Sequence, residues 1–189
     1  MTVAEIFAKI NNHMIEGVML HSQFAEYYDF LNLHGFKRCH EYHALCEFAE
    51  RRGVIRYYIN HFGKLLPEET AKNPEVIPTS WYGYMRHNVD ANTKKRAIRD
   101  GFNRWYEWEV ETKKLYEKAY CDLVELGEIA AAHKIGELVE CVDQELKKAC
   151  RKRIELSSTD YDLSAIYLCQ PEIHEKYKKK SKRIGVKMC

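Results

Sequence analysis

The segment from residue 64 to residue 89 constrains the fold of this chain more than any other. It contains Pro67, Pro74 and Pro78, three of the four prolines in the sequence. It follows a helical stretch of about 27 residues, which is roughly 40 Å long at 1.5 Å per residue. Antiparallel helices need only about 2–8 connecting residues, whereas extended chain needs about 12 or more to recross that length. We therefore predict a crossover between parallel helices, with one helical turn at Ser80–Arg86.

Two antiparallel helices are expected before the crossover. The first begins with the capping box Thr2-Val-Ala-Glu5 and runs to about residue 32. Gly35 is the expected left-handed residue of the turn that follows, and Gly63 ends the second helix after about residue 61. The first helix has a largely apolar face that recurs every three or four residues: Ile6, Ile10, Met14, Gly17, His21, Phe24, Tyr28 and Leu31.

A second pair of helices is expected after the crossover, over about residues 90–126 and 128–156, separated by Gly127. Pro171–Arg183 reads as a further short helix with a lysine-rich end. The buried face of the third helix is predicted to hold Ile98, Phe102, Trp105, Glu109, Thr112, Tyr116, Ala119, Leu123 and Leu126. That of the fourth is predicted to hold Ala132, Ile135, Val139, Val142 or Asp143, Leu146 and Cys150. The pattern predicts an all-α four-helix bundle of two hairpins joined by a crossover.

Cysteine usage and net charge limit the setting of the protein. The seven cysteines form no CxxC pair, and their odd number favours a reducing, cytoplasmic compartment. We expect no signal peptide, because the N-terminus lacks a basic region before an apolar run. No apolar stretch reaches the roughly 20 residues of a spanning helix, so we expect no membrane partner. The formal net charge of +2 gives no global attraction to nucleic acid.

Carboxylates and imidazoles at helical spacing are the candidates for chemistry. Glu109 occupies the middle of an apolar stripe, where a lone carboxylate is costly unless it is protonated, paired or bound to a cation. On the second helix, Glu47 and Glu50 follow His43 by four and seven residues, which places all three on one face. Such donors suit iron, manganese or zinc. Two other interpretations stay open. Glu109 could lie at the rim of the buried face and form an ion pair with Arg104, and the polar face of the second helix could simply be exposed to solvent.

With these residues the chain resembles the ferritin-like superfamily, bacterioferritins and ferritins in particular, over roughly residues 5–155. In that family each hairpin supplies one Glu from its first helix and a Glu-x-x-His from its second, and these hold two iron ions. The segment Gly35-Phe-Lys-Arg38 is similar to the opening of the family's second helix, and counting on from it gives Glu50 as a ligand. The same resemblance implies further ligand positions on the other three helices. They are Glu16 on the first helix, Glu109 within Tyr106-Glu-Trp-Glu109 on the third, and the segment Glu140-Cys-Val-Asp143 on the fourth.

The chain departs from the family pattern at both histidines. Gly53 stands where the second helix should supply one, and Asp143 stands where the fourth should. The resemblance therefore implies Glu16, Glu50, Glu109 and Asp143 as the direct ligands. His43, Glu47 and Glu140 are the candidates to replace the missing groups.

We interpret residues 1–156 as a ferritin-like four-helix bundle and residues 157–189 as a basic C-terminal extension. The leading hypothesis is a self-associating metal-binding bundle of the iron-handling or oxidase type, with iron as the cofactor and manganese or zinc as alternatives. One alternative is a metal-free structural or interaction bundle that has lost the site. Another is a nucleic-acid-associated protein that uses the basic run between Lys176 and Arg183, although a solvated helix end is the favoured reading of that run.

Overall fold

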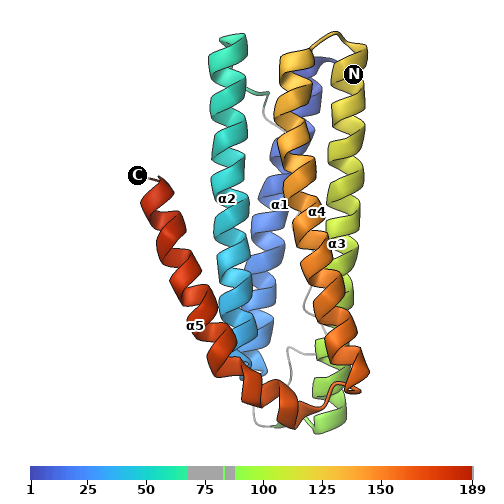
Figure 1. The fold of residues 1–189 in the computed structure, drawn as a ribbon, viewed down its shortest axis with the longest axis vertical. Coiled ribbons are helices and arrows are strands. Elements are labelled where there is room, and N and C mark those ends of the chain that lie inside the picture. Colours follow the sequence, from blue (N-terminus) through green and yellow to red (C-terminus); the bar gives the residue numbers. More distant parts are fainter. Residues whose placement is uncertain (68–82, 84–87, 189) are drawn as a thin grey trace.

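Five helices make up the computed structural model, which describes residues 1–67, 83 and 88–188 and contains no β-strand within these ranges. They are α1 (Val3–Phe30), α2 (His34–Phe62), α3 (Ala91–Glu125), α4 (Ile129–Ser158) and α5 (Leu163–Met188). The first four stand side by side as a bundle, and α5 crosses one end of it and then rises beside α2 (Figure 1). The all-α fold predicted from the sequence is confirmed.

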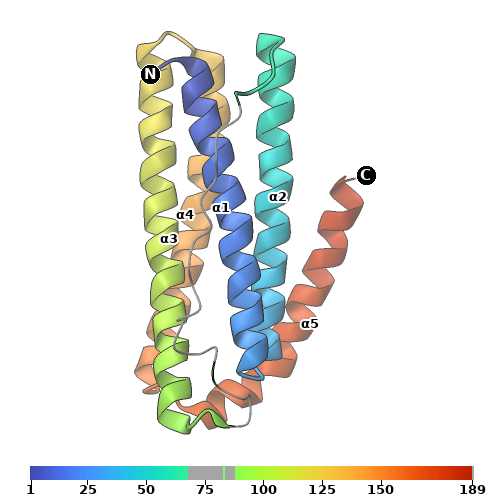
Figure 2. The same ribbon diagram turned by 180° about the vertical axis from the view of Figure 1, so that it is seen from behind.

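The order of the helices in space confirms the predicted crossover. The helices α1 and α2 form one antiparallel hairpin and α3 and α4 form the other, while α2 and α3 run in the same direction (Figures 1 and 2). The helix α2 ends at one end of the bundle and α3 begins at the opposite end. The predicted helical turn at Ser80–Arg86 lies outside the described residues, apart from Gly83.

The start of α1 matches the sequence prediction, whereas the turn that follows α1 does not. The Thr2 hydroxyl accepts from the Glu5 N–H at 3.3 Å, and the Glu5 carboxylate accepts from the Thr2 N–H at 2.8 Å, which is the predicted capping box. The left-handed residue after α1 is Asn32, with φ of 60°, so the assignment of that role to Gly35 was wrong. Gly35 instead lies inside α2, at a point where α5 passes against it. A Cβ at this position would be 2.5 Å from the Gln170 carbonyl oxygen, which explains the glycine.

Apolar side chains fill the bundle at both ends, with polar residues between them. Every residue of the predicted α1 face is buried, and so is the predicted α3 face apart from Leu126, which is 48% exposed. The core near the α1–α2 turn includes Phe24, Tyr28, Phe36, Ile98 and Phe102. The core toward the other end includes Ile6, Ile10, Tyr58, Leu123 and Ile135. These two layers separate the middle of the bundle from solvent at either end.

The helix α5 is longer than the short helix predicted over Pro171–Arg183, and Pro171 lies inside it. Because proline lacks the N–H that the helix would use, it favours a bend, and α5 changes direction along its length (Figure 1). Two hydrogen bonds fasten α5 to the α1–α2 turn. The Phe36 N–H donates to Gln170 Oε1 at 3.0 Å, and the Tyr167 hydroxyl donates to the Leu31 carbonyl at 3.0 Å. The helix thus packs along α2, and the 1–156 and 157–189 division stays a prediction.

Candidate functional site

Four carboxylates from three helices surround the middle of the bundle: Glu47 and Glu50 of α2, Glu109 of α3 and Glu145 of α4. Glu109 is only 3% exposed, and its Oε1 accepts a 2.8 Å hydrogen bond from the Trp105 indole N–H. The Glu47 carboxyl lies against α1 at Gly17, where an added Cβ would be 3.1 Å from Glu47 Cδ. The missing side chain at Gly17 therefore leaves room for Glu47. We call these four residues the carboxylate cluster.

Burial and mutual repulsion raise the pKa values of three members of this cluster, Glu47, Glu50 and Glu109. Burial raises the pKa of Glu109 to about 8, with further contributions from the charges of Glu145 and Glu50. The pKa of Glu50 is raised to about 7, first by burial and then by Glu145. The pKa of Glu47 is raised well above its usual value by burial and by the other three carboxylates. Like charges in a low-dielectric interior cannot all ionise without a compensating cation.

Only Glu145 of the cluster forms an ion pair within the described part of the chain. Its Oε1 accepts from Lys148 Nζ at 2.5 Å, and its Oε2 lies 3.5 Å from His43 Nδ1. Neither Glu47, Glu50 nor Glu109 has a lysine or arginine partner there.

Three buried histidines lie beside the carboxylate cluster: His21 of α1 and His40 and His43 of α2, none more than 3% exposed. The Nδ1 atoms of His21 and His40 are 3.0 Å apart, so one ring donates a proton and the other accepts it. Burial lowers the pKa of each, that of His43 to about 3. The Nε2 atom of His43 is buried and has no hydrogen-bond partner. These imidazoles are therefore neutral near pH 7, the form that binds metals.

The structure places the seven predicted site residues at different depths. His43 and Glu109 are buried, Glu47 and Glu50 are partly buried, and Glu140 is exposed. Asp143 accepts from Lys113 Nζ at 2.6 Å at the surface, with a side chain 39% exposed. Glu16 is partly buried on α1, one residue before Gly17. Gly53 is exposed, and an added Cβ there would meet nothing within 4 Å.

Sequence reasoning missed Glu145 because the predicted face of α4 was rotated. Val139, Leu146 and Cys150 are only partly buried, whereas Leu138, Val142 and Ala149 are buried. Intervals of four, three and four residues connect Leu138, Val142, Glu145 and Ala149, and this helical pattern could have located the residue. His21 and His40 were visible in the sequence, one within the predicted α1 face and the other beside His43. Only the packing of α1 on α2 joins them.

The donors fit a metal site in chemical type but not in their present positions. Carboxylate oxygens and imidazole nitrogens suit iron, manganese or zinc. Neither His43 Nε2 nor Glu145 Oε2 forms a hydrogen bond, so both atoms have capacity to bind a further group. However, no three His, Cys, Asp or Glu side chains among residues 1–67, 83 and 88–188 lie close enough to hold one metal ion.

Two helical hairpins joined through parallel α2 and α3 define a ferritin-like bundle, and comparison with solved structures confirms this fold. An open-pore ferritin from the hyperthermophilic archaeon Archaeoglobus fulgidus superposes with a TM-score of 0.76 at 16% identity, covering 91% of this chain and 95% of that chain. An engineered closed form of the same ferritin gives a TM-score of 0.75 at 17% identity and covers 91% of this chain and 94% of that chain. A humanized archaeal ferritin gives a TM-score of 0.77 at 17% identity, with the same coverage of 91% of this chain and 94% of that chain.

Comparison by sequence adds nothing to this likeness. No protein-family model matches the chain, and no curated protein matches it. At 16–17% identity the solved structures establish the ferritin-like fold, as the resemblance in the sequence predicted. Function must be argued from the site itself. Among the described helices, none is both long and apolar enough to cross a membrane.

Proposed function

We propose that this protein is a ferritin-like bundle that binds a divalent metal cation at Glu47, Glu50 and Glu109, with His43 and Glu145 at the edge of the site. Iron is the proposed cation because the solved structures that share the fold are ferritins, with manganese and zinc as chemical alternatives. One observation carries the proposal: these three interior carboxylates have no cationic partner in the described residues.

Glu47, Glu50 and Glu109 would hold a cation in their ionised forms, with their carboxyl groups closer together than in the present arrangement. Glu47 and Glu50 are less than one helical turn apart on α2 and face the same side, so rotations about their side-chain bonds bring them together without moving the backbone. Trp105 already fixes one oxygen of Glu109, which leaves the other free to bind. A cation with a charge of +2 offsets the repulsion that otherwise keeps these groups neutral.

The surrounding residues limit the contact of the donors with water, since Glu109 and His43 are buried and Glu47, Glu50 and Glu145 are partly buried. Apolar layers above and below the cluster keep the site in a low-dielectric interior, where charge interactions are stronger. Bound iron would supply one-electron redox chemistry. The Nε2 atom of the neutral His43 side chain has no hydrogen-bond partner, so it is free to bind a cation or a proton. This combination supports iron handling or oxidation as the specific role.

Metal titration of the untagged protein tests the proposal. We expect the purified protein to bind Co²⁺ at pH 8.5 and to oxidise Fe²⁺ in air, as followed by near-ultraviolet absorbance. Glu109→Gln should weaken Co²⁺ binding at least 10-fold, since it removes a charged ligand. Asp143→Asn is the matched control, because that residue is paired with Lys113 outside the cluster, and it should change binding less than 2-fold. No binding and no oxidation by the parent protein would leave the metal-free structural bundle as the correct reading.

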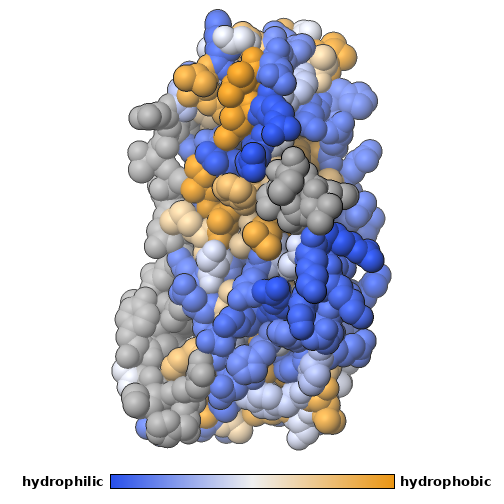
Figure 3. All heavy atoms as spheres, turned by 90° about the vertical axis from the view of Figure 1, so that its left-hand side faces the viewer, coloured by the Kyte–Doolittle hydropathy of each residue, from blue (hydrophilic) through white to orange (hydrophobic). Residues whose placement is uncertain are grey.

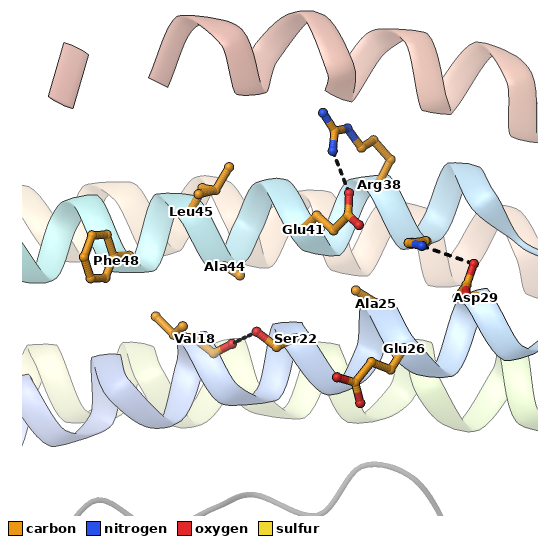
Figure 4. A pocket seen from close by; sticks show the side chains of 11 residues that line it. Val18, Ser22, Ala25, Glu26, Asp29, Arg38, Glu41, Ala44, Leu45 and Phe48 are labelled. Carbon is orange, nitrogen blue, oxygen red and sulfur yellow. Dashed lines mark hydrogen bonds and ion pairs between the residues drawn. The ribbon is translucent and has the colours of Figure 1, made fainter. Parts of the chain in front are cut away.

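Self-association is part of this proposal, and the outer face of α1 and α2 supports it. A groove of about 650 Å³ runs between these helices, with Val18, Ala25, Leu45 and Phe48 among its lining residues (Figure 4). Leu45 and Phe48 are 37% and 41% exposed. Acidic and basic side chains both line it, which suits a contact between two copies related by two-fold symmetry. Hydrophobic atoms also gather in the upper half of the face on the α2 and α5 side (Figure 3).

Analytical ultracentrifugation tests this surface. The parent protein should sediment as an oligomer, and Phe48→Asp should lower its mass because a charge would be buried in the contact. Leu168→Asp on α5 is the control, since this apolar residue is 82% exposed and lies outside the groove. A parent protein that is monomeric at all concentrations would contradict the proposal.

A further inference from the structure

The C-terminal half of α5 carries the excess positive charge of the chain. Residues 172–183 contain six basic and two acidic residues, which give this stretch a formal charge of +4. Because the whole chain carries only +2, the remaining residues together carry a formal charge of −2. The net positive charge of the protein is therefore concentrated on this one stretch of helix.

Most of these cations have no acidic partner. Lys178 forms an ion pair with Glu175 at 3.3 Å. Within the described part of the chain, no carboxylate pairs with the other five, which are Lys176, Lys179, Lys180, Lys182 and Arg183. On α4, by contrast, three lysines are each paired with a glutamate of the same helix. The positive charge of α5 is thus available to an external anion.

Aromatic contacts hold the basic stretch against α2. The ring of Tyr177 lies 5.4 Å from that of Tyr42, centre to centre. The Nζ atom of Lys180 lies 5.5 Å from the centre of the Tyr42 ring and 5.1 Å from that of the Tyr177 ring. Lys176 Nζ lies 5.6 Å from the centre of the Tyr177 ring. Contacts of this kind attract a cation to the ring without neutralising its charge. The orientation of the basic stretch is therefore fixed, with Tyr177 toward α2.

Cations lie on both sides of the exposed surface of α5. At 3.6 residues per turn, three of them fall on one side of the line that faces α2 and two fall on the other. These are Lys176, Lys180 and Arg183 on the first side, and Lys178 and Lys182 on the second. Lys179 lies between the two sides, nearly opposite Tyr177. The C-terminal half of α5 also diverges from α2 toward its end (Figures 1 and 2), so the basic helix projects from the bundle.

The major groove of B-DNA matches this arrangement. The groove is about 12 Å wide and admits an α-helix, and a phosphate backbone runs along each of its edges. The two basic sides of α5 would face the two backbones. The major groove of an RNA duplex is too narrow for the same approach. Lysine binds phosphate as a point charge and does not distinguish bases by paired hydrogen bonds. Hydrophilic side chains dominate the lower half of the face on the α2 and α5 side (Figure 3).

We propose that the C-terminal half of α5 binds the phosphate backbones of double-stranded DNA without regard to base sequence. This inference is independent of the proposed metal-binding function. Each phosphate contact releases counter-ions and adds about 0.9 to the slope of log affinity against log salt concentration. About five contacts therefore give a slope of about −4.5, which is a loss of about 500-fold between about 50 and 200 mM KCl.

Fluorescence anisotropy with a labelled DNA duplex of about 20 base pairs tests the proposal. The untagged full-length protein is used in the presence of EDTA, so that a bound metal cannot contribute. We expect a Kd of about 1–100 μM near physiological salt, the range of non-specific binding, together with the steep salt dependence. A duplex of unrelated sequence should bind within about 2-fold, and an RNA duplex of equal length should bind about 10-fold more weakly.

A triple variant removes three exposed cations of α5: Lys179→Gln, Lys182→Gln and Arg183→Gln. Removing about three phosphate contacts should reduce the salt slope by about 2–3 and weaken DNA binding about 10-fold or more at 100 mM KCl. The aromatic contacts of Lys176 and Lys180 are left in place. Thermal unfolding followed by circular dichroism should be the same as for the parent protein, because the substituted side chains are at the surface.

The matched control removes the same charge from other helices: Lys9→Gln on α1 with Arg96→Gln and Lys114→Gln on α3, all exposed positions. The helix α3 lies on the far side of the bundle from α5 (Figure 1). This variant should bind DNA within about 2-fold of the parent protein, with an unchanged salt slope. Equal losses in the two triple variants would show that net charge rather than α5 attracts DNA, and would overturn the inference.

Three further results would overturn the inference. The first is a lack of DNA binding by the parent protein at 50 mM KCl. The second is equal or tighter binding to the RNA duplex, and the third is binding to phosphatidylserine vesicles in preference to DNA. Because all measurements are made without metal, none of these results bears on the proposed metal-binding function, which the Co²⁺ titration tests separately.

Discussion

The indole nitrogen of Trp105 donates a 2.8 Å hydrogen bond to Oε1 of Glu109, one turn along the same helix. The same indole ring lies 5.0 Å from the ring of His40 and 5.2 Å from that of His43, centre to centre. Trp105 therefore contacts both a member of the carboxylate cluster and two of the buried histidines. Its contact with an acid whose pKa is raised to about 8 makes it a natural optical reporter of the site.

The fluorescence of Trp105 should titrate with Glu109. Ionisation of the carboxyl changes the charge at the indole N–H, so the emission of the metal-free protein should change with a midpoint near pH 8. Glu109→Gln should abolish this transition, because the amide still accepts the hydrogen bond but does not ionise. A midpoint between pH 4 and 5 in the parent protein would show that burial does not control Glu109.

The free energy of unfolding should fall as the pH rises from about 4.5, the pKa of Glu109 in the unfolded chain, to about 8, its pKa in the folded protein. The folded protein keeps the Glu109 proton up to about pH 8, whereas the unfolded chain releases it near pH 4.5, so between these values folding takes up a proton. Glu109→Gln removes this effect. It should match the parent protein near pH 4.5 and exceed it in stability at pH 9 by a few kcal/mol, as judged from urea unfolding. Asp143→Asn, the surface control, should give no such gain.

Acid should destabilise the protein through its buried histidines. The unfolded chain takes up a proton at His43 near pH 6.5, but burial lowers the pKa to about 3 in the folded protein, so stability is lost as the pH falls from 6.5 toward 3. In His43→Gln, which cannot be protonated in this range, this part of the loss should disappear. The exposed His34 is the control, and His34→Gln should leave the acid transition in urea unchanged. An identical transition in His43→Gln would contradict the assignment.

Two glycines of α2 should respond in opposite ways to the same substitution. Gly35→Ala places a Cβ 2.5 Å from the Gln170 carbonyl oxygen, so α5 must shift, and we expect a loss of about 1–3 kcal/mol in the free energy of unfolding. Gly53→Ala meets nothing within 4 Å and should add about 0.5–1 kcal/mol, because alanine favours the helix. Urea unfolding of both variants measures the difference. Equal effects would mean that α5 does not pack on Gly35.

Local sequence signals were sufficient for most of the fold. The apolar period of α1 predicted a face whose residues are all buried, and the length of the segment between α2 and α3 predicted their parallel direction. Both properties depend on helix geometry and chain length alone. The turn after α1 was predicted wrongly, because the packing of α5 on Gly35 cannot be seen in the neighbouring residues. The length of α5 was missed for a similar reason, since Pro171 usually marks a helix start.

The candidate site divides in the same way. Glu109 could be identified from sequence because a carboxylate interrupts an apolar stripe, and His43, Glu47 and Glu50 because their spacing places them on one helical face. Glu145 and His21 joined them only when the helices packed, since the rotation of α4 and the pairing of α1 with α2 are set by contacts between distant residues. The sequence by itself determined which helices form and how they connect. Tertiary packing decided which polar groups share the interior, because burial and mutual distance, rather than residue type, set their charges and partners.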